Sequence, residues 1–199
     1  MLNKKAAMFG LDARIALAIF GALSVISGAA LYSAIQTAKN TQYLATLSEI
    51  TKSFEAYLLD TGTIPAFHTS NILDAGELVS SSKSGWQGPY TSIKLADFGA
   101  TCTDCGLDGS QFPHDGFSTI VFSAQKEDSA PASGLTSCTS GDDCMVWVVF
   151  IYTSLAQAQA WDEFIDGELN AKTGKFRFRV SSDPVKYYTY FQTGISLNI

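Results

Sequence analysis

The feature that most constrains this chain is an uninterrupted apolar run near its N-terminus. Ile15 to Ile35 reads IALAIFGALSVISGAALYSAI, 21 residues without a charge, which as a helix is long enough to cross a bilayer core of about 30 Å. Lys4, Lys5 and Arg14 precede it, so the positive-inside rule predicts a cytoplasmic N-terminus and an external location for the rest of the chain. A secretory signal cut after Ser27-Gly28-Ala29 is an alternative, although the apolar run continues past that point. An uncleaved signal anchor is a further alternative.

The helical pattern does not stop where the apolar run ends. Beyond residue 35, apolar side chains recur every three or four positions, as on one face of a helix: Leu44, Leu47, Ile50, Phe54, Tyr57 and Leu58. No proline lies between Leu11 and Leu59, and Gly62 and Pro65 then supply a stop signal. The pattern predicts one helix over residues 11–60, about 70 Å long, with a transmembrane half at 15–35.

The remaining sequence predicts a globular domain over residues 61–199. Residues 66–116 are rich in turn-forming residues, so we expect a long loop with one short helix near 73–79. Four strands are predicted at 117–124, 145–153, 175–180 and 185–192, and the run 154–169 has helical spacing. The strand at 145–153 is apolar on both faces and is expected at the centre of the sheet. The predicted fold class is α+β, with the amphipathic half of the long helix packed on an antiparallel sheet of about four strands.

The charge pattern and the motif content argue against several classes of function. The formal net charge is -6, so no basic surplus is present to displace counterions from nucleic acid. Lys175, Arg177 and Arg179 share one face of a predicted strand, which we interpret as solvated, whereas Phe176, Phe178 and Val180 are expected to point inward. We find no nucleophile elbow, zinc-protease motif or phosphate-binding loop, and His68 and His114 are isolated, so we expect no enzyme activity and no cofactor.

Carboxylates also occur in the predicted loops, without the ordered spacing of a calcium loop. We therefore expect them to be solvated and predict no metal site: Asp104, Asp108, Asp115, Asp142 and Asp143.

The four cysteines are the remaining candidates for chemistry. The chain has an even number of cysteines: Cys102, Cys105, Cys138 and Cys144. In a domain outside the cytoplasm, this number indicates two structural disulfides. Local pairing of Cys102 with Cys105 and of Cys138 with Cys144 is our choice, and the two crossed connectivities stay open. The CxxC at 102–105 is followed by Gly106-Leu107-Asp108-Gly109-Ser110, which we interpret as loop rather than the helix that a redox site requires. The spacing of the second pair is wider than zinc sites usually have.

Four short motifs, taken in order, carry a family resemblance. Met1 to Gly10 is a lysine-bearing leader that ends in glycine directly before the hydrophobic helix. The helix ends with Tyr57…Asp60-x-Gly62-x-x-Pro65, and Gly85-Trp86-Gln87-Gly88-Pro89-Tyr90 follows. The fourth motif is Phe164-Ile165-Asp166-Gly167…Gly174-Lys175-Phe176-Arg177. Together they resemble the type IV pilins and the pseudopilins of type II secretion systems.

The resemblance implies that a prepilin peptidase cuts between Gly10 and Leu11 and that the new amine is methylated. Loss of ten residues and two lysines would leave 189 residues with a net charge of -8. Most relatives carry glutamate at the fifth mature position, where this chain has Ile15, and Asp12 is the candidate for that role in assembly.

The same resemblance implies a structural subunit of a homopolymeric filament, assembled by helix packing. Its further partners would be an assembly platform protein, an assembly ATPase and the membrane. The precursor would lie in the inner membrane before it enters an extracellular pilus or, for a pseudopilin, a short periplasmic fibre. A membrane-tethered thiol-redox or binding protein is the remaining alternative, and it would need a reactive thiol.

Overall fold

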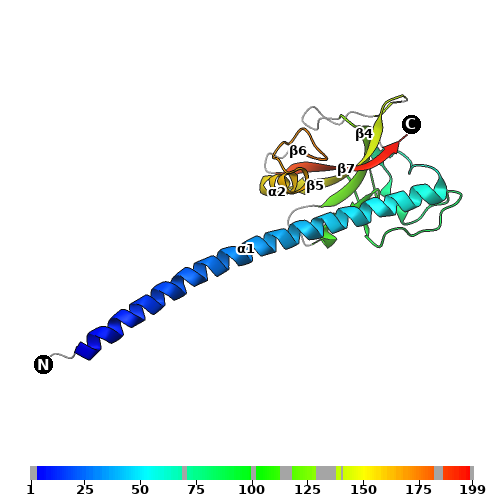
Figure 1. Ribbon diagram of the computed structural model, residues 1–199. Helices are drawn as coiled ribbons and strands as arrows, with labels where there is room; N and C mark the ends of the chain where they lie inside the picture. Colours follow the sequence, from blue (N-terminus) through cyan, green and yellow to red (C-terminus); the bar gives the residue numbers. More distant parts are fainter. Residues whose placement is uncertain are drawn as a thin grey trace. The chain divides into compact units, whose positions relative to one another are not determined.

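A computed structural model describes residues 4–68, 71–99, 102–112, 118–128, 138–139, 141–181 and 186–197, with the backbone alone for 4–9 and 11. The chain divides into two compact units, residues 1–42 and 43–199 (Figure 1). The described part of the first unit is helical throughout. The second unit combines the end of the same helix with an antiparallel sheet, which confirms the α+β class.

Helix α1 runs from Lys4 to Thr61 without interruption. It begins before the expected residue 11, because the alanine, methionine and lysine residues ahead of Gly10 are good helix formers. It ends where the sequence predicts a stop: Gly62 has a positive φ of 63°, and its N–H donates to the Leu58 carbonyl at 2.9 Å.

The sheet has seven strands in the described part of the chain, so the expectation of about four was wrong. The strands are β1 (Ile72–Leu73), β2 (Leu95–Ala96), β3 (Gly106–Asp108), β4 (Thr119–Lys126), β5 (Cys144–Thr153), β6 (Phe176–Val180) and β7 (Tyr187–Leu197). Their order is β2-β3-β4-β5-β7-β6, with β1 paired to β4, and every pairing is antiparallel. The additional strands β1, β2 and β3 lie in the segment expected to be a loop. Strands of two or three residues are too short to show an alternating pattern.

In the described part of the second unit, two short 3-10 helices and one α-helix accompany the sheet and the end of α1. Helix η1 (Ala75–Leu78) coincides with the short helix expected near 73–79, and η2 (Gly109–Gln111) follows β3. Helix α2 (Leu155–Asp166) begins after Ser154, whose hydroxyl accepts from the Gln157 N–H, and is shorter than expected because Gly167 ends it with a positive φ of 76°.

Strand β5 lies at the centre of the sheet, as predicted, and alternates between two apolar clusters. Val146, Val148 and Phe150 face the larger cluster, which includes core residues of α1 and α2. On this side, the ring of Tyr43 in α1 stacks on that of Trp161 in α2 with centroids 3.6 Å apart. Trp147, Val149 and Ile151 belong to the second cluster, on the other side of the sheet. The core of this unit is therefore built on both faces of β5.

Strand β6 has its expected position, but two expectations about its side chains were wrong. Arg177 is buried rather than solvated, with an exposed fraction of 8%, because its guanidinium lies 4.8 Å from the centre of the Trp147 ring. Arg179 stacks in the same way on Tyr188, at 5.1 Å. Val180 is 50% exposed instead of pointing into the core, where Phe176 and Phe178 do lie.

Candidate functional site

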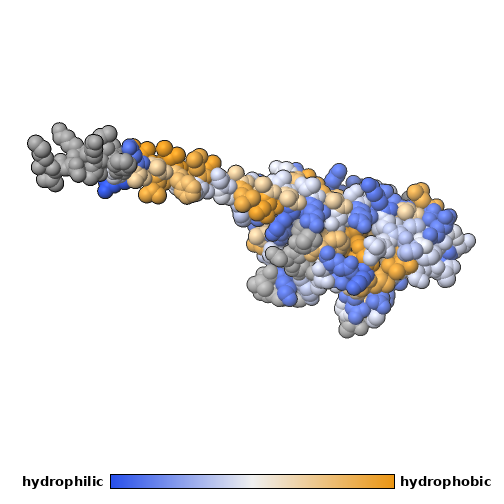
Figure 2. Space-filling view, turned by 90° about the horizontal axis from the view of Figure 1, so that it is seen from below, coloured by the Kyte–Doolittle hydropathy of each residue, from blue (hydrophilic) through white to orange (hydrophobic). Residues whose placement is uncertain are grey.

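The first part of α1 presents apolar side chains around the whole helix. Its large apolar residues are exposed from Ile15 to Ile35, and none of its most hydrophobic stretch, with a mean hydropathy of 2.1, is buried within the chain. Figure 2 shows hydrophobic side chains along the visible face of this stretch. In the described chain, α1 is the one helix long and apolar enough to cross a membrane, judged by length and composition. A surface of this kind is unfavourable in water and requires lipid or protein to cover it.

The sequence-predicted cleavage and assembly residues lie within this helix. Gly10 has open space around it, with no atom within 4 Å of the place where a Cβ would stand. Leu11 continues the helix, and the side chains of Asp12 and Arg14 are exposed. Small residues follow and are likewise exposed, which leaves room for a close helix neighbour: Gly21, Ala22, Ser24, Ser27, Gly28, Ala29 and Ala30.

The structure brings together two of the motifs, residues 57–65 and 85–90, between which the sequence has nineteen residues. The end of α1 meets the segment 85–90, where the Tyr90 hydroxyl donates to Asp60 at 2.8 Å and the Tyr90 ring lies edge-on to Tyr57 at 5.8 Å. Gly85 has a positive φ of 84°, and a Cβ there would stand 2.2 Å from the Asp60 carbonyl oxygen. The chain therefore needs glycine at this point for both its conformation and its close approach to the helix end.

A carboxylate that the sequence did not single out holds this junction together. Glu77 accepts hydrogen bonds from the Tyr57 hydroxyl and from the Ala66 N–H at 3.1 Å, and it forms an ion pair with Lys83 at 2.9 Å. Burial acts to raise the pKa of Glu77, but these partners outweigh it and hold the pKa below its usual value. The Glu77 carbonyl also accepts from the Trp86 indole at 2.9 Å.

Two carboxylates of α2 accept hydrogen bonds from the connection that follows the helix and hold it against α2. This contact explains the fourth motif. Asp166 accepts from the N–H groups of Lys175 and Phe176, at 3.1 and 2.9 Å. Gly174 has a positive φ of 91°, which favours glycine, and a Cβ there would stand 2.1 Å from the Asp166 carboxylate, which would have to move. One turn earlier, Asp162 is fully buried and accepts from the Asn170 N–H at 2.7 Å.

The second oxygen of Asp162 has no hydrogen-bond partner among the described residues. Burial therefore raises the pKa of Asp162, despite the bond from Asn170, and the nearby Asp166 and Glu168 add to the rise.

Each cysteine is paired with the cysteine nearest to it in the sequence, which is the local pairing chosen from the sequence. Disulfides join Cys102 to Cys105, with Cα atoms 5.7 Å apart, and Cys138 to Cys144, at 5.9 Å. The segment after Cys105 was expected to be loop, but it forms β3, and Cys144 is the first residue of β5. Cys102 and Cys105 are buried, whereas thiol exchange with a partner requires an accessible sulfur. The arrangement anchors loops to the ends of strands.

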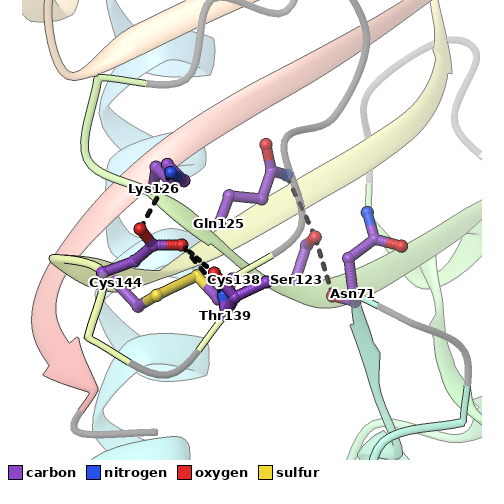
Figure 3. Close-up of a disulfide and its surroundings, with 8 residues drawn as sticks. Asn71, Ser123, Gln125, Lys126, Cys138, Thr139 and Cys144 are labelled. Carbon is purple, nitrogen blue, oxygen red and sulfur yellow. Dashed lines mark hydrogen bonds and ion pairs between the residues drawn. A yellow bond between two sulfur atoms is a disulfide. The ribbon is translucent and has the colours of Figure 1, made fainter.

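Figure 3 shows the second disulfide beside a small polar cluster at the ends of β4 and β5. Asp142 accepts from the N–H and hydroxyl of Thr139 and pairs with Lys126 at 2.8 Å. Lys126 and Thr139 together lower the pKa of Asp142 to about 2. Asp108 instead caps η2 by accepting from Ser110. These acids, expected to be solvated, thus have local structural partners.

Several other sequence candidates are placed without forming a site. The His68 side chain is exposed, and His114 and Asp115 lie outside the described residues. Within the described ranges, no three His, Cys, Asp or Glu side chains gather closely enough to hold a metal ion. Glu77, Lys83 and Asp162 were missed by sequence reasoning. Of these three residues, only Asp162 could have been noticed in the sequence, because a carboxylate there falls at a core position of the helical pattern in 154–169.

Comparison with known proteins gives no family: no family model, no curated protein and no solved structure matches this chain.

Proposed function

We propose that this chain is a structural subunit of a type IV pilus-like filament, anchored in the inner membrane before assembly and without enzyme activity. The observation that carries the proposal is one continuous helix with two different surfaces. Its first part exposes apolar side chains all around, whereas residues of its second part are buried in the core of an α+β domain. The all-round apolar surface of the first part is suited to contact with lipid before assembly and with the same helix of other subunits afterwards.

The proposed processing step follows from the resemblance of residues 1–10 to a prepilin leader. A prepilin peptidase would cut between Gly10 and Leu11 on the cytoplasmic side, and the new amine would be methylated. The rest of α1 would stay in the membrane until an ATPase-driven platform adds the subunit to a filament. Gly10 is exposed and has no side chain, which is compatible with entry into a peptidase subsite that excludes side chains.

Mass spectrometry of the N-terminus of protein from the native host tests this proposal. We expect a mature chain that starts at Leu11 and carries a methyl group. An intact Met1, or a start near Ala30 as for a secretory signal, would refute it. Gly10→Val should block cleavage, because a β-branched side chain replaces a hydrogen, whereas the same change at Gly21 should leave cleavage intact.

Electron microscopy of material sheared from cells then separates the two filament classes. Long fibres that contain this chain indicate a surface pilus. A processed subunit that stays with the envelope indicates a pseudopilin of a type II secretion system.

A further inference from the structure

The second part of α1 carries an exposed stripe on the side opposite its core-facing residues. We call it the α1 stripe: Ala45, Ser48, Glu49, Lys52, Glu55 and Leu59. Steps of three, four and seven residues place these side chains on one face of the helix. Leu59 is 84% exposed on this face, and the neighbouring Leu44 is 37% exposed. Leu44 and Leu59 are 15 positions apart, and apolar side chains exposed singly are normal on a protein surface, so they do not by themselves indicate a partner.

Two hollows lie on either side of the line from Ser48 to Lys52, and both residues line each of them. One has a volume of about 280 Å³ and reaches toward β7, with Glu55 and Phe191 in its walls. The other has a volume of about 500 Å³ and reaches toward Tyr90, with Glu49 in its wall. A ridge between two grooves is the shape on which a second helix packs.

The charges on the α1 stripe alternate along the helix. Lys52 lies near its centre, and Glu49 and Glu55 are displaced by about 60° to either side. Neither glutamate forms an ion pair with Lys52 within the described chain. A sequence of negative, positive and negative groups at three-residue steps is complementary to itself when two parallel copies are staggered, and repulsive when they are in register.

From this pattern the geometry points to a second copy of this chain as the occupant of the stripe. Lys52 of one copy pairs with a stripe glutamate of the next, while small side chains let the helices approach closely. Because opposite sides of the stripe carry Glu49 and Glu55, each copy presents one acid to each of two neighbours. The contact is head-to-tail and leaves both ends open, which suits a filament rather than a closed dimer. The inference rests on the proposed function and adds the pairing that sets the stagger.

Charge reversal in the native host tests the inference. Lys52→Glu makes the stripe wholly negative, and Glu49→Lys combined with Glu55→Lys makes it wholly positive. Like charges then face each other, so each variant alone should lower the yield of sheared fibres by at least about tenfold. Co-expression of the two variants should restore the yield, because every contact between unlike copies is again attractive. A pairing within one helix could not be rescued in this way.

Two controls make the result decisive. Lys172→Glu is the control for Lys52→Glu, because it changes the net charge by the same amount at an exposed lysine in the α2–β6 connection. This control variant should leave the fibre yield unchanged. Leader cleavage and the thermal midpoint of each stripe variant should match wild type. Normal yield from Lys52→Glu, or no restoration on co-expression, would overturn the inference. Wild-type cells that make neither a processed subunit nor fibres would instead overturn the proposed function, and this inference with it.

Discussion

Substitution of Gly85 by alanine tests whether the junction between the end of α1 and the segment 85–90 stabilises the domain. Two separate costs arise at this position. The backbone has a φ of 84°, which an L-residue adopts at a cost of about 1 kcal/mol. The new Cβ would also stand 2.2 Å from the Asp60 carbonyl oxygen, a distance that real contacts do not reach, so the segment must move away from the helix end.

The displacement removes interactions whose worth can be estimated. Tyr90 would lose its hydrogen bond to Asp60, and the Trp86 indole would lose its bond to the Glu77 carbonyl, each worth about 1 kcal/mol. With the conformational cost, Gly85→Ala should destabilise the domain by about 3 kcal/mol, which is about 6–12 °C in Tm for a chain of this size. Gly62→Ala is the matched control: φ is 63°, but no atom lies within 4 Å of its Cβ position. That variant should lose only about 2–4 °C.

Tryptophan fluorescence of the full chain in mild detergent measures this loss directly. All three tryptophans, at positions 86, 147 and 161, belong to the second unit, so the signal reports the unfolding of that unit alone. If Gly85→Ala lowers the Tm no further than Gly62→Ala does, the close approach has no energetic weight, and the junction is not what fixes the segment 85–90.

Three further predictions concern single groups. The Asp12→Ala variant should be inserted and cleaved normally but yield few fibres. Asp12 is the only acid before Glu49, and under the proposed function it would neutralise the terminal amine of a neighbouring subunit. A wild-type yield of fibres would refute this prediction. All four cysteines should resist alkylation in denatured, unreduced protein, and two freely alkylated thiols would contradict the disulfides. Asp162 and Glu77 should have opposite effects on pH dependence. The pKa of Asp162 is raised above 3.8, so its contribution to stability is present at low pH and is lost as pH rises through the raised pKa; Asp162→Asn should therefore gain Tm relative to wild type as pH rises above 3.8. The pKa of Glu77 is lowered below 4.5, so its contribution is present above 4.5 and is lost as pH falls through the lowered pKa; Glu77→Gln should therefore be less stable than wild type above pH 4.5, and the difference should shrink as pH falls below that value.

The sequence predicted those elements whose burial is regular over many residues. Helix α1 shows one apolar face for several turns beyond residue 35, and β5 is a long β-branched and aromatic run, so the end of α1 and both ends of β5 were located to within one residue, whereas the start of α1 was placed seven residues too late. The stop at Gly62 was also predicted, because a positive φ at a helix end strongly favours glycine, whereas the stop at Gly167 was missed, since the expected helical run extended to residue 169.

Features that depend on a partner far along the chain were not visible in the sequence. The alternation in β6 correctly separated Phe176 and Phe178 from the arginines, but it could not show that Trp147 lies beneath Arg177. Burial of that arginine depends on the pairing of β6 with β7 and of β7 with β5. Glu77 looks like any helix-surface acid in sequence, and its role appears only when the end of α1 comes beside η1. For the candidate site, the sequence predicted the exposed apolar helix and the local cysteine pairs, and cleavage between Gly10 and Leu11 stays a prediction. The α1 stripe requires knowledge of which face of the helix is buried.

The apolar first part of α1 also bears on what kind of partner the chain needs. In the second unit, the helix-facing side of the sheet is already covered, since Tyr43, Phe54 and Trp161 pack on it and are fully buried. Interiors of this kind are close-packed and have no room for a further helix without the loss of existing contacts. The apolar residues exposed from Ile15 to Ile35 therefore find no free apolar surface on that side of the sheet. Under the proposed function, lipid tails would cover these residues before assembly and other copies of the helix would cover them afterwards, and both would use the same all-round apolar surface with small residues that permit close packing.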